Sequence, residues 1–197
     1  MTHYRLMTER KVIELFRDGD QEAGNELFRR FNGRLYAMCL NITRNNDIAI
    51  EVVQETFFRL LKIRSRIDVE RNFSSFIHKM AFNLCMDELR KRKQSSQWDE
   101  FAWVEGEAPA SDDEFLLKEK EISLEAVWEA VDKLPLSART LVELRYRSEL
   151  SPEEIATVLE IPASTVRVRL HRARKLLAGH LAYLIRGENE TETAEEA

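Results

Sequence analysis

Apolar residues recur along most of the chain at the three-to-four-residue spacing of amphipathic helices. Helices are predicted over residues 8–17, from Asp20 past Cys39, and over 47–64, 73–93, 119–134 and 136–147. A polar loop over 66–72 joins the third and fourth of them. Because glycine (6) and proline (4) are scarce among 197 residues, we expect an all-α protein.

Residues 150–177 carry the pattern of a helix-turn-helix. Ser151 is placed to cap a short helix, with Pro152 at its first position and Glu154 completing a capping box. Glu160-Ile161-Pro162 ends that helix. A second apolar stripe follows at spacings of four, three and four: Val166, Leu170, Ala173 and Leu177. Its opposite face is basic, and a helix with an apolar back and a basic front fits the DNA major groove.

Charge is distributed unevenly, although the whole chain carries a net charge of −5. Residues 1–93 carry a net +5, residues 94–121 a net −7, residues 122–187 a net +2, and the segment from Glu188 a net −5. Two basic blocks are thus separated by an acidic connector and followed by an acidic tail. Since local fields rather than the total act on a ligand, a nucleic-acid partner is compatible with the acidic total.

Several classes of protein find little support in this sequence. The four histidines lack metal-ligand spacing, and we identify neither a glycine-rich phosphate loop nor a nucleophile elbow. We therefore expect no enzyme, metal, cofactor or small-molecule substrate. Cys39 and Cys85 lie on apolar helical stretches without a CxxC partner, which indicates buried free thiols. No apolar run reaches membrane-spanning length and no signal peptide is apparent, so a cytoplasmic location without membrane insertion is expected.

The helix predicted over 47–64 has apolar residues on too many sides for one buried face. One stripe, expected to face the helical bundle, consists of Ala49, Ile50, Val53, Phe57, Leu60 and Leu61. Ile48, Val52 and Phe58 point elsewhere, beside charged residues. This second strip indicates either a protein docking site or a face covered by another helix of the same domain.

Four segments together resemble the extracytoplasmic-function (ECF) sigma factors, a family of small bacterial transcription initiation factors. They are EVVQETF at 51–57, FSSFIHKMAFNLCMDELRKRK at 73–93, LPLSARTLVELRYR at 134–147, and the helix-turn-helix at 150–174. The resemblance implies sigma region 2 over 8–93, a flexible acidic linker over 94–118, sigma region 4 over 119–187, and a disordered acidic tail over 188–197. It implies three partners: core RNA polymerase through its largest-subunit clamp, promoter DNA, and an anti-sigma factor.

The resemblance also implies roles for individual residues. The residues expected to bind core polymerase are Glu51, Val52, Gln54, Glu55 and Phe58. Those expected to read the −10 element, where the family captures a flipped base, are Arg66, Arg71, Asn72, Lys79, Asn83 and Arg90. Those expected at the −35 element are Arg145, Thr165, Arg167, Val168, Arg169, His171, Arg172 and Arg174. Among these, Arg167 is the candidate for a guanine edge.

This chain departs from the family pattern at four positions. Glu51 replaces aspartate, Ser164 replaces glycine, and Val168 replaces a polar residue. Phe76 stands where the family often has tryptophan, which leaves both a melting role and a core role open. Base preference at the −35 element is therefore expected to differ from that of other members.

A stand-alone helix-turn-helix regulator with a helical effector domain is the alternative function. Such a protein is expected to dimerise and to bind a palindromic site, since a two-fold protein reads two half-sites. That alternative leaves the segments at 51–57 and 73–93 unexplained.

Overall fold

The computed structural model describes residues 2–91 and 123–195, with side chains described over 4–91 and 123–181. Every element of the described ranges is a helix, which confirms the all-α prediction. The N-terminal half contains α1 (Thr2–Arg5), α2 (Glu9–Arg17), α3 (Gln21–Thr43), α4 (Asn46–Ile63), η1 (Arg64–Arg66) and α5 (Phe73–Lys91). The C-terminal half contains α7 (Leu124–Asp132), α8 (Leu136–Val142), η2 (Glu143–Arg147), α9 (Pro152–Leu159) and α10 (Ala163–Glu195).

Side-chain caps start the helices of the N-terminal half. Thr8, Asp20 and Asn45 each lie in extended backbone and accept a hydrogen bond from a backbone N–H of the first turn. Helices α3, α4 and α5 then pack against one another around side chains that include Leu27, Leu35 and Ile77. Both cysteines are buried free thiols, as predicted.

The buried face of α4 differs from the predicted stripe. Ile48 and Val52 are only 4% and 3% exposed, whereas Ile50 and Leu61 are 40% and 48% exposed. The true inward stripe passes through Thr56, whose hydroxyl donates to the Val52 carbonyl oxygen (2.7 Å) and so enters the core satisfied. The sequence favoured a stripe without any hydroxyl, and that choice rotated the predicted face.

The helix-turn-helix forms as the sequence predicts. The Ser151 hydroxyl and the Glu154 carboxylate complete a capping box at the start of α9, with Pro152 at the first helical position. Glu160 ends α9 in the left-handed region at φ 56°. The α10 stripe is buried, and its members Val166, Leu170, Ala173 and Leu177 are at most 6% exposed.

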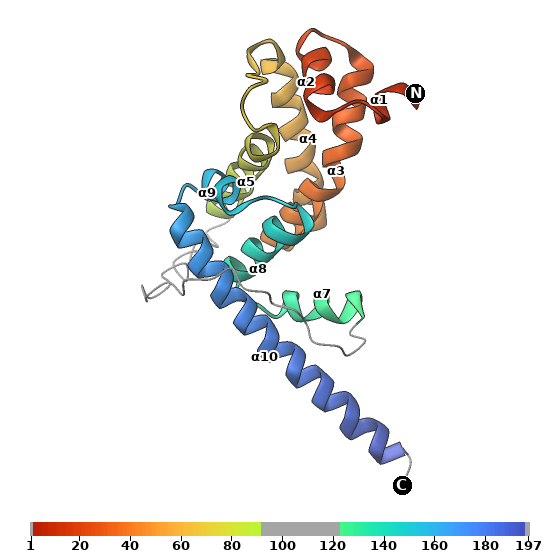
Figure 1. The fold of residues 1–197 in the computed structure, drawn as a ribbon, viewed down its shortest axis with the longest axis vertical. Helices are drawn as coiled ribbons and strands as arrows, with labels where there is room; N and C mark the ends of the chain where they lie inside the picture. The colour runs from red at the N-terminus through yellow and green to blue at the C-terminus, as the bar shows by residue number, and fades with distance from the viewer. Residues whose placement is uncertain (1, 92–122, 196–197) are drawn as a thin grey trace.

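Helix α10 continues to Glu195, so residues 188–195 are helical and the prediction of a disordered tail there is wrong. Glutamate and alanine are good helix formers, and no proline follows Pro162, so nothing local stops the helix. Figure 1 shows α10 projecting away from the rest of the chain. The predicted linker over 94–118 lies outside the described residues, and the domain boundaries remain predictions.

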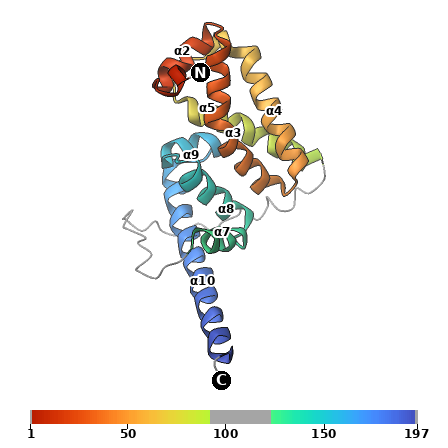
Figure 2. The ribbon, with the colours of Figure 1, turned by 90° about the vertical axis from the view of Figure 1, so that its right-hand side faces the viewer.

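The two halves of the chain pack against each other. Helix α9 lies beside α5, and α8 lies against α3, as the two views in Figures 1 and 2 show. The larger apolar cluster is continuous across this contact, because it joins Leu27 and Ile77 of the N-terminal half to Leu144, Ile155 and Val158. A smaller cluster, including Val131 and Leu177, lies within the C-terminal half. None of the described helices has the length and apolarity needed to cross a bilayer.

Candidate nucleic-acid interface

The first turns of α10 present the predicted −35 residues opposite the buried stripe. Arg167 and His171 are exposed, and Val168 is half-buried between them. The Arg167 guanidinium pairs with the carboxylate of Glu153 on α9. The helix-turn-helix thus holds its candidate base reader against a carboxylate of its own first helix.

The predicted phosphate-binding residues flank this face. Arg145 is exposed at the end of α8 and donates to the Leu150 carbonyl oxygen (3.1 Å), which fixes its direction. Thr165, Arg169, Arg172 and Arg174 are half-buried along α10. The structure therefore brings the eight predicted residues together on α10 and the turn before α9, with Arg167 among the most exposed.

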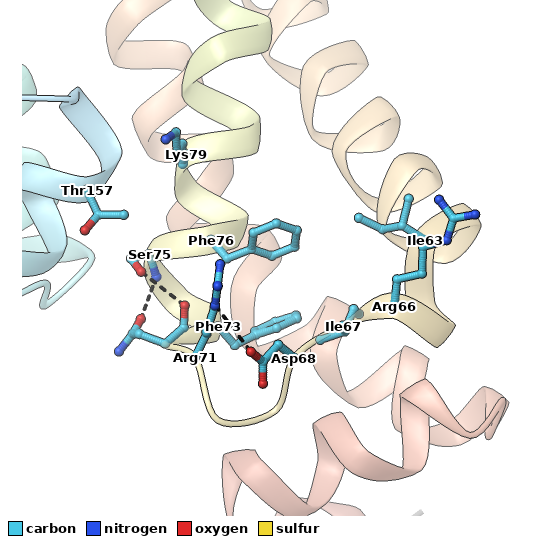
Figure 3. A pocket seen from close by; sticks show the side chains of 11 residues that line it. Ile63, Arg66, Ile67, Asp68, Arg71, Phe73, Ser75, Phe76, Lys79 and Thr157 are labelled. Carbon is cyan, nitrogen blue, oxygen red and sulfur yellow. Dashed lines mark hydrogen bonds and ion pairs between the residues drawn. The ribbon is translucent and has the colours of Figure 1, made fainter.

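A pocket of about 460 Å³ opens between the loop over 66–72 and the start of α5 (Figure 3). Four predicted −10 residues line it: Arg66, Arg71, Asn72 and Lys79. Sequence reasoning missed other lining residues, including Ile63, Ile67 and Thr157. Thr157 comes from α9, and no local signal in the sequence could have placed it beside the loop.

The aromatic side chain of Phe76 lies in this pocket and is 38% exposed. Its exposure argues against the core role that the sequence left open. Asn72 Oδ1 accepts from the Ser75 backbone N–H (2.7 Å), so the asparagine caps α5 and is fixed at the rim. Asp68 lies 3.3 Å from Arg71 and anchors the opposite side.

Asn83 and Arg90 lie outside the pocket lining. Both are exposed on α5, and Arg90 forms an ion pair with Asp87 (3.4 Å). Asn83 comes one helical turn after Lys79, so it continues the same helix toward its carboxyl end. The predicted −10 residues thus form one group at the loop and a second group farther along α5.

The predicted docking residues on α4 divide into exposed and buried. Glu51, Gln54 and Phe58 are exposed, and Glu55 pairs with Arg59 (2.7 Å). The Lys62 ammonium lies 4.0 Å from the centroid of the Phe58 ring. Val52 is buried in the core, so its prediction as a surface anchor is wrong.

Helix α9 touches the −10 surface directly. Lys79 Nζ lies 2.7 Å from Glu160 Oε1, and the Asn72 amide donates to the Glu154 carboxylate. The hydrogen bond from Lys79 lowers the pKa of Glu160 below its usual value. Within the described ranges, His, Cys, Asp and Glu side chains form no group of three that could hold a metal ion.

Known protein families match both halves of the chain. The family described as Sigma-70 region 2 matches residues 27–95, and the family described as Sigma-70, region 4 matches residues 124–177. The fold resembles the solved structure of CnrH in complex with the cytosolic domain of CnrY, with a TM-score of 0.62 and 20% identity over 89% of this chain and 97% of that one. It also resembles the sigma factor RpoE of Bartonella quintana in complex with the anti-sigma factor NepR, with a TM-score of 0.59 and 19% identity over 80% and 96% of the two chains.

Full-length relatives are equally consistent. The chain is 33% identical over 182 residues to the ECF RNA polymerase sigma factor SigW of Bacillus subtilis, a match that covers 89% of this chain and 97% of that protein. It is 27% identical over 188 residues to the ECF RNA polymerase sigma-E factor of Escherichia coli K12, covering 91% and 97%. The chain therefore belongs to the extracytoplasmic-function family of RNA polymerase sigma factors.

Proposed function

We propose that this sigma factor directs core RNA polymerase to promoters by three separate surfaces. The first turns of α10 read the −35 element, the pocket beside the 66–72 loop takes the −10 element, and the exposed face of α4 docks on the polymerase. The observation that carries the proposal is the exposed Arg167 on the basic face of a capped helix-turn-helix. The chain acts in the cytoplasm, where its partners lie, and contributes specificity rather than catalysis.

Arg167 is the proposed base reader of the −35 element. Its guanidinium is exposed and long enough to donate two hydrogen bonds to a guanine edge. The half-buried Val168 offers an apolar contact for a thymine methyl group. The arginines along α10 and Arg145 supply phosphate contacts, which give affinity and salt dependence rather than sequence choice.

The pocket beside the 66–72 loop is the proposed acceptor for an unstacked base of the −10 element. Phe76 offers a ring for stacking, and Asn72 offers an amide already fixed by its bond to Ser75. Unstacking a base costs a few kcal/mol, and aromatic stacking returns about 1–3 kcal/mol per base. Arg66 and Lys79 at the rim are suited to the adjoining phosphates.

An anti-sigma factor is the proposed regulator. The sigma factor RpoE of Bartonella quintana was solved with such a partner, and this chain shares its fold. Release from that partner would make the sigma factor available to core polymerase.

The test of this function combines the purified chain, sigma-free core polymerase and genomic DNA of the source organism. RNA 5′ ends are then mapped by sequencing. We expect discrete starts that share a −35 and −10 pair. An absence of starts, with an active control sigma factor on the same core enzyme, would refute the proposed function.

Replacing Arg167 by alanine is expected to weaken promoter-specific initiation without changing affinity for core polymerase. Loss of one bidentate base contact corresponds to about 1–3 kcal/mol of discrimination, or roughly 5- to 150-fold. Initiation rates on a mapped promoter measure the effect. Glu153→Ala is the matched control, because it removes the same ion pair but keeps the guanidinium. If both variants initiate like the wild type, another residue reads the −35 element.

Replacing Phe58 by aspartate is expected to weaken core binding at least 10-fold, since interface hot spots are commonly aromatic and contribute 2 kcal/mol or more. Affinity is measured with labelled sigma factor and core polymerase in solution. The control is Leu61→Asp on the same helix, where the leucine is 48% exposed but lies outside the predicted docking residues. If only the control variant loses affinity, the docking face of α4 is the one around Leu61.

A further inference from the structure

Three carboxylates of the C-terminal half engage side chains that the proposed function assigns to DNA. Glu160 pairs with Lys79, Glu154 accepts from Asn72, and Glu153 pairs with Arg167. All three carboxylates belong to α9 or to its C-terminal cap. Because a carboxylate and a phosphate offer similar anionic oxygens to a cation or an amide, each contact occupies a group that DNA would otherwise use.

The geometry of α9 brings the two reading surfaces within a few residues of each other. Glu153 contacts the −35 reader and the adjacent Glu154 contacts the −10 pocket, while consecutive Cα atoms lie about 3.8 Å apart. By the positions that name them, the two promoter elements lie about 25 base pairs apart, or about 85 Å along straight B-DNA at about 3.4 Å per base pair. One chain in this arrangement cannot contact both elements.

The ion pairs across this contact all have the same polarity. Three join the halves within the described residues: Lys79–Glu160 (2.7 Å), Arg34–Glu149 (2.6 Å) and Arg44–Asp132 (3.0 Å). In each, the cation belongs to the N-terminal half and the carboxylate to the C-terminal half. The acidic side of α9 and its neighbours thus complements the surface that we assign to the negatively charged DNA.

Polar groups buried at the same contact are incompletely satisfied. Asn41 on α3 donates to the carboxylate of Glu143 on η2 (3.3 Å), and Arg139 on α8 donates to the Asn41 carbonyl oxygen (3.0 Å). Asn41 Oδ1 and Arg139 Nε are buried without a hydrogen-bond partner among the described residues. Burial raises the pKa of Glu143, although Arg147 and Asn41 oppose the shift. Separation of the halves would return these groups to water, which lowers the cost of opening.

We propose that this arrangement is an autoinhibited state of the sigma factor, in which α9 acts as a latch that covers the −10 surface and holds Arg167 away from DNA. The inference rests on the proposed function. Apolar packing between α5 and α9 holds the latch closed, and the three ion pairs fix its position. Core polymerase binds the open state in preference and shifts the population toward it.

Distances between spin labels in the free protein test the closed state. Gly33 on α3 and Gly179 on α10 are helical glycines with open space around an added Cβ, so Gly33→Cys/Gly179→Cys accepts a label at each site. Cys39 and Cys85 are fully buried and stay unlabelled. We expect one short, narrow distance in the free chain and a longer one after core polymerase is added. A long or broad distribution in the free chain would overturn the inference.

Charge reversal tests the ion pairs themselves. In the labelled chain, Glu149→Arg/Glu160→Arg is expected to shift the population toward the long distance without core polymerase. The control Glu129→Arg/Glu153→Arg changes the net charge equally but alters no pair between the halves. Adding Arg34→Glu to Glu149→Arg is expected to restore the short distance. Equal distances in the charge-reversed variant and the control would refute the latch.

A reversible cross-link connects the closed state to transcription. Arg34→Cys/Glu149→Cys, joined by a short cleavable bis-maleimide, fixes the halves at a contact outside the proposed DNA and polymerase surfaces. We expect promoter-specific initiation with core polymerase to fall at least 10-fold and to recover when the linker is cleaved. Full initiation by the cross-linked chain would overturn the inference. Failure of the cleaved chain and the wild type alike would instead refute the proposed function.

Discussion

Replacing Val52 by aspartate is expected to unfold the N-terminal half of the protein. Val52 is 3% exposed in the packed face of α4, so the new carboxylate would lie in an apolar core without a cationic partner. An unpaired buried charge and the lost apolar contact together cost on the order of 4 kcal/mol or more, against a typical total of about 5–15 kcal/mol. Urea denaturation followed by circular dichroism measures the loss.

Phe58→Asp is the matched control, because it places the same charge on the same helix at a side chain that is 52% exposed. Its free energy of unfolding is expected to stay within about 1 kcal/mol of the wild type. A Val52→Asp variant with native stability would contradict the packing of α4. Reduced polymerase binding by Val52→Asp therefore reports unfolding, and Phe58 is the residue that tests docking.

Features set by neighbouring residues were predictable from the sequence. The capping box at Ser151 and the Val166 to Leu177 stripe depend only on residues three or four positions apart, and both form as expected. The same holds for the start of α4 at Asn45, whose side chain accepts from the Ile48 backbone N–H (3.0 Å). These interactions are local, so the sequence contains all the information needed to place them.

The faces that the helices bury depend on contacts between distant segments. Helix α4 carries two overlapping apolar stripes, and only its packing against α3 and α5 decides that Val52 is buried and Ile50 is exposed. The pairing of Lys79 with Glu160 joins residues 81 positions apart in sequence. Neither outcome leaves a periodic signal, so neither could have been predicted from one sequence.

The candidate site shows the same division. Arg66, Arg71, Asn72 and Lys79 were predicted at the −10 surface because they follow one another along a loop and a helix, and they do line one pocket. Thr157 lines that pocket from α9, and only the contact between the halves brings it there. The residues of one element were accessible to sequence reasoning, whereas the residue from the opposite half was not.

His78 makes the fold sensitive to acid. The imidazole is fully buried on α5, and its Nδ1 lies 2.7 Å from the Ser74 carbonyl oxygen. A carbonyl oxygen only accepts, so Nδ1 carries the proton and Nε2 is an acceptor, buried without a partner among the described residues. Burial lowers the pKa of His78 from 6.5 to about 4, and among its charged neighbours Arg34 on α3 lowers it further while Glu154 on α9 opposes the shift.

The depressed pKa means that the unfolded chain binds a proton that the folded chain refuses. Stability is therefore complete above pH 6.5 and is lost as the pH falls from 6.5 toward 4. The two pKa values correspond to about 3 kcal/mol in total and about 2 kcal/mol between pH 7 and pH 5. His78→Asn keeps a donor for the Ser74 carbonyl oxygen but does not titrate. Urea denaturation of both proteins at pH 7 and pH 5 is expected to show an acid-induced loss about 2 kcal/mol smaller in the variant. Equal losses in the two proteins would mean that other groups dominate the acid sensitivity.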